Sequence, residues 1–240
     1  MAGHSRWAQI KHQKSGTDAK RGVLFSKLGR IITIAARDGG PDPAMNPKLR
    51  QAVDQARAAG VPKDNIERAI QRAAGSADAA NLRAMEYEAY GPGGAAFLIA
   101  ALTDSPNRTT NEVKRLLDDH GGRLAETGSV AWMFERKIAI ALPPPPATAR
   151  DEFELFLIDG GAEAIEEDDD ALHVLIAPDR SAAFIAHLTT RGAAPLSTAL
   201  TAISKNPMTL SPADKTAAAT LAAELEDHAD VTDVWTNIAD

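Results

Sequence analysis

Cysteine is absent from the 240 residues of this chain, and that absence excludes several kinds of site. Disulfide bonds, cysteine-ligated zinc, iron–sulfur clusters and cysteine nucleophiles all require a residue that the chain lacks. Long apolar segments are missing too, since the longest run, residues 95–102, is far shorter than the roughly 18 residues of a membrane-spanning helix. The first fifteen residues are polar and basic, which is unlike a secretory signal. We therefore expect a protein that does not span a membrane and that suits a reducing cytoplasm, although an acid-poor start of this kind can also resemble a transit peptide.

Signatures of catalysis are missing as well. The six histidines show no HExxH spacing, and no serine lies in a GxSxG turn. The glycine-rich residues 91–94 lack the Lys-Ser/Thr pair of a phosphate-binding loop, so we interpret them as a hairpin turn. The acidic residues 166–170 do not alternate as calcium ligands do, and we interpret them as a solvated turn. We expect no enzymatic activity, no metal ion, no cofactor and no small-molecule substrate.

Charge is distributed unevenly along the chain, although the net charge is only −7. Residues 1–80 carry 14 Lys and Arg against 7 Asp and Glu, whereas residues 81–240 carry 12 against 26. The first 37 residues alone hold eight cations and one acid. Such asymmetry is typical of a protein in which a basic segment binds a polyanion, most often nucleic acid, while the rest of the chain does not bind it. The alternative is a basic helix that is simply solvated.

Helical periodicity dominates the first third of the chain. Apolar residues recur at helical spacing in residues 18–37, and a Gly-Gly-Pro segment ends that helix. Asn46 and Pro47 supply an N-cap and a first-turn proline for a second helix, which ends at Gly60, and a third helix follows at residues 62–75. The short turn between the last two helices is compatible with a DNA-binding helix-turn-helix and also with an ordinary helical hairpin.

Alternating apolar residues then predict strands. The first group is a hairpin of strands 83–90 and 95–103, a helix 107–119 capped by Asn107, and a strand 129–134 that would bury Trp132. The second group has the ferredoxin-like order βαββαβ, with elements at 138–142, 150–159, 162–166, 171–177, 179–191 and 196–203. A final helix, 212–228, and strand, 231–238, cannot bury a core alone, so we expect them to complete the first sheet.

The predicted fold class is therefore α+β, with three domains. The first is a basic tail and helical domain, residues 1–80. The second is a discontinuous α+β domain made of residues 81–136 and 206–240, and the third is a ferredoxin-like domain, residues 137–205, inserted in it.

Several sequence blocks resemble a known family. The opening MAGHSRWAQIKH, the segment PKDNIERAI at residues 62–70 and the segment ETGSVAWMF at residues 126–134 are similar to those of the YebC/PmpR family. The departures are modest: Gln13 replaces a common lysine, Pro41 interrupts a glycine run, and Trp235 replaces a more usual tyrosine. Because the family's opening motif starts at Met1, the resemblance implies a bacterial cytoplasmic protein without a cleaved transit peptide.

The resemblance also implies a three-domain α+β fold and a function in gene expression. Bacterial members of that family are classed as transcriptional regulators that bind DNA. The similar mitochondrial member is a translational activator of cytochrome c oxidase subunit I, and some bacterial relatives help ribosomes through proline-rich stretches. We predict a non-enzymatic, DNA-binding transcriptional regulator; the alternative is a ribosome-associated translation factor that binds ribosomal RNA and relieves stalls.

The candidate nucleic-acid-binding residues follow from charge and from the matched blocks. Trp7 lies among cations in a segment with little apolar periodicity, so it either stacks on a base or folds onto its own helical domain. Most of the others are N-terminal cations expected to contact phosphates. Two are loop arginines of further blocks that resemble the family, Arg108 in the segment NRT at residues 107–109 and Arg123 in residues 120–134. The full set is Arg6, Trp7, Lys11, Lys14, Lys20, Arg21, Lys27, Arg30, Arg108 and Arg123.

Overall fold

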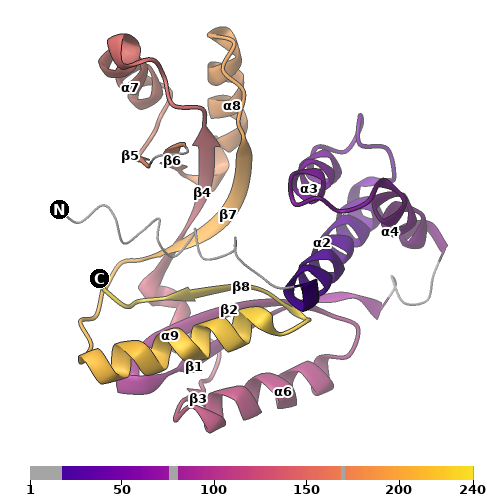
Figure 1. Cartoon of the computed structure of the whole chain (residues 1–240), viewed down its shortest axis with the longest axis vertical. Coiled ribbons are helices and arrows are strands. Elements are labelled where there is room, and N and C mark those ends of the chain that lie inside the picture. The colour runs from indigo at the N-terminus through magenta and orange to yellow at the C-terminus, as the bar shows by residue number, and fades with distance from the viewer. Residues whose placement is uncertain (1–17, 76–80, 169–170, 240) are drawn as a thin grey trace. The chain divides into compact units, whose positions relative to one another are not determined.

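The computed structural model describes residues 18–75, 81–168 and 171–239, which form an α+β fold (Figure 1). They divide into two compact units. Among the described residues, the smaller unit is Phe134–Lys205, and the larger unit combines residues 18–75 and 81–133 with Asn206–Ala239. Among the helices of the described residues, none has both the length and the apolar character to cross a bilayer.

A three-helix bundle opens the larger unit, and its helices are α2 (Asp18–Gly39), α3 (Pro47–Ala58) and α4 (Lys63–Gly75). Their apolar stripes meet in one core, whose fully buried side chains include Ile32, Leu49 and Ala56. Asn46 caps α3, because its side chain accepts a hydrogen bond from the Leu49 amide at 3.1 Å. The three predicted helices are confirmed.

A four-stranded antiparallel sheet forms the rest of the larger unit. Its strand order is β3-β1-β2-β8, and residues of helices α6 and α9 share one buried core with the sheet (Figure 1). The elements are β1 (Arg83–Tyr90), the 3-10 turn η1 (Pro92–Gly94), β2 (Ala96–Thr103), α6 (Pro106–Asp119), β3 (Arg123–Leu124), the 3-10 turn η2 (Ala131–Met133), α9 (Pro212–Asp227) and β8 (Val231–Thr236). Since β8 pairs with β2, the last helix and strand do complete the first sheet.

The smaller unit is ferredoxin-like. Its strands are ordered β5-β6-β4-β7, which places the first and third strands of the βαββαβ motif at the centre. Ile140 faces Val174 and Leu142 faces Leu172 across the two central strands, and α7 and α8 add Leu157 and Phe184 to the same core. The elements are β4 (Phe134–Leu142), η3 (Ala147–Ala149), α7 (Arg150–Asp159), β5 (Ala164–Glu167), β6 (Leu172–Ile176), η4 (Pro178–Arg180), α8 (Ser181–Thr190) and β7 (Ser197–Ser204).

Two sequence predictions are wrong in detail. Residues 129–134 do not form a strand: a turn leads into η2, β4 begins at Phe134, and Trp132 is 56% exposed instead of buried. Asn107 is not an N-cap, because α6 already begins at Pro106 and Ser105 precedes it. The α+β class with a helical domain and an inserted ferredoxin-like domain is confirmed. The boundaries at residues 80, 136 and 205 stay predictions.

Candidate nucleic-acid interface

The predicted site residues fall into three groups. Arg6, Trp7, Lys11 and Lys14 lie outside the described residues. Lys20 lies in the first turn of α2, and Arg21, which follows it, is exposed. The remaining four, Lys27, Arg30, Arg108 and Arg123, have described side chains whose contacts differ sharply.

Lys27 is held against the C-terminal part of α9. Its ammonium group donates a hydrogen bond to the carbonyl oxygen of Glu226, and the side chain is half-buried. Burial lowers the pKa of Lys27, and the nearby carboxylates of Glu226, Asp233 and Asp227 offset this effect only in part. Lys27 therefore connects the helical bundle to the α+β part of its unit.

Arg30 and Arg108 converge on one buried carboxylate, that of Asp230, whose side chain is 1% exposed. Arg30 Nη1 lies 2.6 Å from Oδ1, and Arg108 Nη2 donates to Oδ2 at 2.9 Å. The hydroxyl of Thr109 donates to the same Oδ2 at 2.7 Å. Burial favours the neutral acid, but the hydrogen bonds from Thr109 and Arg108 and the charge of Arg30 outweigh it and lower the pKa of Asp230.

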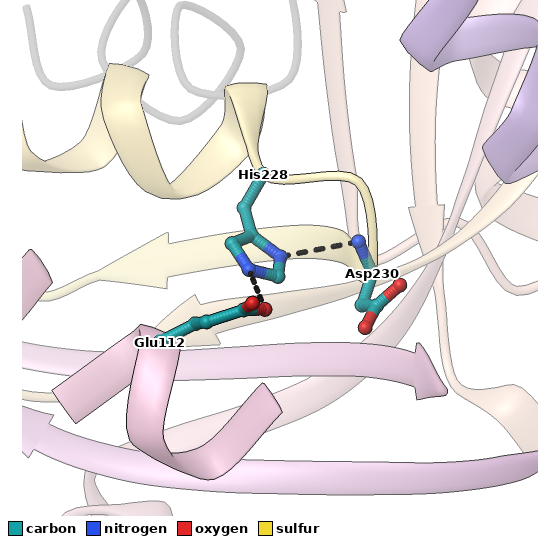
Figure 2. A group of neighbouring side chains, drawn as sticks. All are labelled: Glu112, His228 and Asp230. Atoms are coloured by element: carbon teal, nitrogen blue, oxygen red, sulfur yellow. Dashed lines mark hydrogen bonds and ion pairs between the residues drawn. The ribbon is translucent and has the colours of Figure 1, made fainter. Parts of the chain in front are cut away.

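Figure 2 shows Asp230 beside His228 and Glu112, whose ligand-type atoms all lie within 4.8 Å of one another. His228 Nδ1 accepts the backbone N–H of Asp230 at 3.1 Å, so its Nε2 carries the proton that faces Glu112 Oε2 at 3.0 Å. Both ring nitrogens are thus occupied, and two arginines neutralise Asp230. Because a cation would have to displace these partners, the cluster is better suited to joining α6 to the start of β8 than to binding a metal.

Arg123 differs from the other three cations. Its guanidinium lies over the ring of Tyr90, 5.2 Å from the ring centroid, and the side chain is exposed. Tyr90 and Arg123 line an open hollow of about 540 Å³ whose other walls are glycines, namely Gly91, Gly93, Gly94, Gly121 and Gly122. The hollow lies where the β1–β2 hairpin meets the turn between α6 and β3.

A buried carboxylate fixes the loop before η2. Glu88 accepts backbone hydrogen bonds from Gly128 and Val130, both at 2.6 Å, and from Ala131 at 2.8 Å. Burial alone would raise the pKa of Glu88, but these three donors hold it below the ordinary value. This loop carries Trp132, which the sequence analysis placed in a buried strand. The sequence feature that could have marked Trp132 as functional is its position in the block 126–134, which resembles the family.

The α3–α4 pair offers few groups for reading bases. Both helices pack against α2 in the common core. Arg68 donates to the side chain of Asn65 and, at 3.2 Å, to the carbonyl oxygen of Asp64, while Lys63 lies 3.5 Å from Glu67. Four polar side chains of α4 are therefore engaged with one another or with the helix itself.

We expect Asp230→Asn to lower the free energy of unfolding by about 3 kcal/mol, because at a buried position Arg108 loses a charged hydrogen-bond acceptor and Arg30 loses its ion-pair partner. Urea denaturation at pH 7 measures the change. The control is Asp119→Asn, which removes an exposed ion pair with Arg115 and should cost less than about 1 kcal/mol. Equal effects of the two substitutions would contradict the structural importance of Asp230.

We expect Glu88→Gln to destabilise the protein at pH 7 by about 2 kcal/mol. One carboxylate oxygen becomes an NH2 group, which cannot accept a hydrogen bond from the loop N–H groups. The folded-state pKa of Glu88 is lowered, so its contribution is present above the unfolded pKa and is lost as pH falls through the folded pKa. The difference between the two proteins should therefore shrink in acid. Chemical denaturation from pH 7 to pH 3 tests this, with Glu86→Gln, an exposed residue of β1, as the control; a pH-independent difference would argue against it.

Two family models match the chain. The TACO1/YebC protein N-terminal domain matches residues 5–76, and the TACO1/YebC second and third domain matches residues 82–238. A protein of Kosmotoga olearia, named "Probable transcriptional regulatory protein", is 44% identical over 237 residues, which cover 99% of this chain and 94% of the relative. A Brachyspira hyodysenteriae protein of the same description is 38% identical over 239 residues, covering 99% and 96%.

A solved structure is also similar. The crystal structure of a conserved hypothetical protein from Aquifex aeolicus superposes with a TM-score of 0.85 at 36% sequence identity, covering 97% of this chain and 96% of that one. The family models, the full-length relatives and this structure agree with the resemblance in the sequence blocks. This chain belongs to the TACO1/YebC family.

Proposed function

We propose that this protein is a non-enzymatic regulator of gene expression that acts by binding nucleic acid, and that its target is DNA, as for a transcriptional regulator. The observation that carries the proposal is the segregation of charge between a basic N-terminal third and an acidic remainder. Relatives named "Probable transcriptional regulatory protein" support the same conclusion. The proposal places the protein in the cytoplasm, where bacterial DNA and ribosomes are found.

Cations on the surface of the helical bundle support this assignment. The bundle exposes more cationic than acidic side chains, and phosphate neutralisation by such side chains supplies most non-specific affinity for nucleic acid. The exposed cations are Arg21, Arg37, Lys48, Arg50, Arg57, Lys63, Arg68 and Arg72. The N-terminal tail adds Arg6, Lys11 and Lys14 without any acidic residue. We propose that the tail and Lys20 and Arg21 of α2 contact phosphates together, with Trp7 stacking on a base.

Lys27, Arg30 and Arg108 have a smaller part in this proposal. Each already donates to a protein acceptor, and a phosphate would have to compete with Glu226 or Asp230. We retain them as flanking cations, because Arg108 is 46% exposed and Arg30 is 25% exposed. Their ion pairs also predict that they contribute less to the salt dependence of binding than the tail does.

A second candidate function is a ribosome-associated translation factor that contacts ribosomal RNA. The engagement of Arg68 with Asn65 and Asp64 favours it, because a recognition helix in a DNA major groove needs such side chains free for base edges. Structured RNA is recognised mainly through its shape and phosphates, which makes fewer demands on α4.

Replacing Arg6, Lys11 and Lys14 by glutamine should weaken binding to duplex DNA and lower the steepness of the log–log salt dependence by about three. The physical reason is that each phosphate contact releases counterions from the DNA. Six contacts therefore give a log–log salt slope of about −5. Fluorescence anisotropy over a range of salt concentrations measures the slope. The matched control replaces Lys114, Arg115 and Lys215, three exposed cations of α6 and α9, and should leave the slope unchanged. An unchanged slope in the tail variant would refute the tail assignment.

Sucrose gradients of a gently lysed native extract separate the two candidate functions. We expect the protein to stay apart from ribosomes, and the purified protein to retain a promoter fragment against excess competitor DNA. Parallel gradients after DNase, after RNase and at raised salt complete the design. Co-sedimentation with ribosomes that survives DNase but is lost with RNase or salt would instead establish translation as the function.

A further inference from the structure

A second candidate surface lies on the α+β part of the larger unit and is built from residues 90–132. Its floor is the glycine-lined hollow described above, of about 540 Å³. Gly93, Gly94 and Gly121 have φ values of 67°, 81° and 71°, a backbone region that favours glycine. At Gly122 an added Cβ would lie 2.7 Å from the Tyr90 carbonyl oxygen. The backbone thus demands glycines here, and the result is a wall without side chains that a ligand can approach closely.

The cation at the edge of this hollow is available. Within the described part of the chain, Arg123 has no carboxylate partner, in contrast to Arg30 and Arg108. Its guanidinium is oriented by the Tyr90 ring, and the side chain remains exposed. An arginine placed over an aromatic ring and left unpaired is well suited to a phosphate group, which it can bind through two parallel hydrogen bonds.

An exposed indole shares a hydrogen-bond acceptor with Tyr90. The Tyr90 hydroxyl donates to the carbonyl oxygen of Ser129 at 3.2 Å, and Trp132 Nε1 donates to the same oxygen at 3.0 Å. The polar edge of the indole is therefore satisfied, yet 56% of Trp132 is exposed. What remains accessible is apolar aromatic surface on a loop that Glu88 fixes through three backbone amides.

We propose that Trp132, Tyr90, Arg123 and the glycine-lined hollow form a binding site for an unpaired nucleotide. The base stacks on the indole of Trp132, and its phosphate reaches Arg123 at the hollow. Aromatic planes combined with arginine are the usual means of holding single-stranded nucleic acid, whereas the bases of a duplex are already stacked on one another. Among the residues that the structure describes, those lining the hollow include no aliphatic side chain, which makes it a poor pocket for the apolar anchor of a protein partner.

This inference rests on the proposed function, because it assumes that nucleic acid is the partner. It adds a preference for unpaired strands that the phosphate contacts of the tail cations do not provide, in addition to the stacking proposed for Trp7. The tail would bring the polyanion to the protein, and the Trp132 site would select a bulge, a loop or an opened strand.

The test compares Trp132→Ala, Trp132→Phe and Arg123→Gln in the full-length protein. The probes are three fluorescein-labelled oligonucleotides of one sequence: single-stranded DNA, single-stranded RNA and duplex DNA. Trp132→Ala should weaken binding to the single strands by about tenfold, and Trp132→Phe by less, because a ring remains for stacking. Arg123→Gln should reduce the log–log salt slope on single strands by about one. Duplex binding should change less than about twofold in all three variants.

The controls are Leu200→Ala, which removes an exposed apolar side chain of β7, and Arg115→Gln, which removes an exposed cation of α6. Both should bind all probes as the unsubstituted protein does, and matching thermal unfolding curves confirm that every variant is folded. Comparing the single-stranded DNA and RNA probes identifies which of the two nucleic acids the site prefers.

Two outcomes would overturn the proposal in distinguishable ways. If single-strand affinity does not change in Trp132→Ala while duplex binding persists, the unpaired-nucleotide site is refuted, the proposed function stands, and the exposed indole is left to a protein partner. If the unsubstituted protein binds none of the probes, the proposed function itself fails and the site fails with it.

Discussion

The buried carboxylate of Asp230 is the point on which the larger unit depends. A charge removed from water is tolerated only when it is paired and hydrogen-bonded. Arg30 of α2, Arg108 and Thr109 of α6 together meet that demand, and the Leu102 amide binds the Asp230 carbonyl oxygen at 2.8 Å. Arg30, 200 positions earlier in the sequence, and Arg108, 122 positions earlier, are thereby tied to the residue that precedes β8. Charge thus takes part in specifying how the helical bundle packs on the sheet.

Most of the fold was predictable because its signals are local. The periodicity of α2, the Asn46–Pro47 start of α3 and the alternation in β4 and β6 each reflect burial of one face of an element. The topology followed from the βαββαβ order and from the inability of a lone helix and strand to form a core. The failure at residues 129–134 has a different origin. There the backbone amides bind the Glu88 side chain, forty positions earlier, and sequence periodicity carries no sign of that long-range acceptor.

The candidate site was less predictable, because counting cations does not reveal their partners. Lys27, Arg30 and Arg108 were indistinguishable in sequence from cations that face solvent, yet they donate to acceptors within the protein. Arg123 belongs to the acidic part of the sequence, residues 81–240, yet its guanidinium faces an aromatic ring instead of a carboxylate. A charge pattern thus identifies which third of the chain carries the excess of cations, but only three-dimensional contacts separate the cations that are paired within the fold from those that are not.

The way the ferredoxin-like unit begins and ends has an evolutionary consequence. Phe134, its first residue, is paired in register with Ser204 near its end, so the chain enters and leaves at adjacent positions of one antiparallel pair. Backbones paired in this way are only about 5 Å apart, a gap that a tight turn can close. The unit is therefore attached as a module: its loss or exchange would shorten one connection between η2 and α9 while every strand pairing of the β3-β1-β2-β8 sheet stayed intact. Selection can consequently vary the acidic insert and the unit that carries it at different rates.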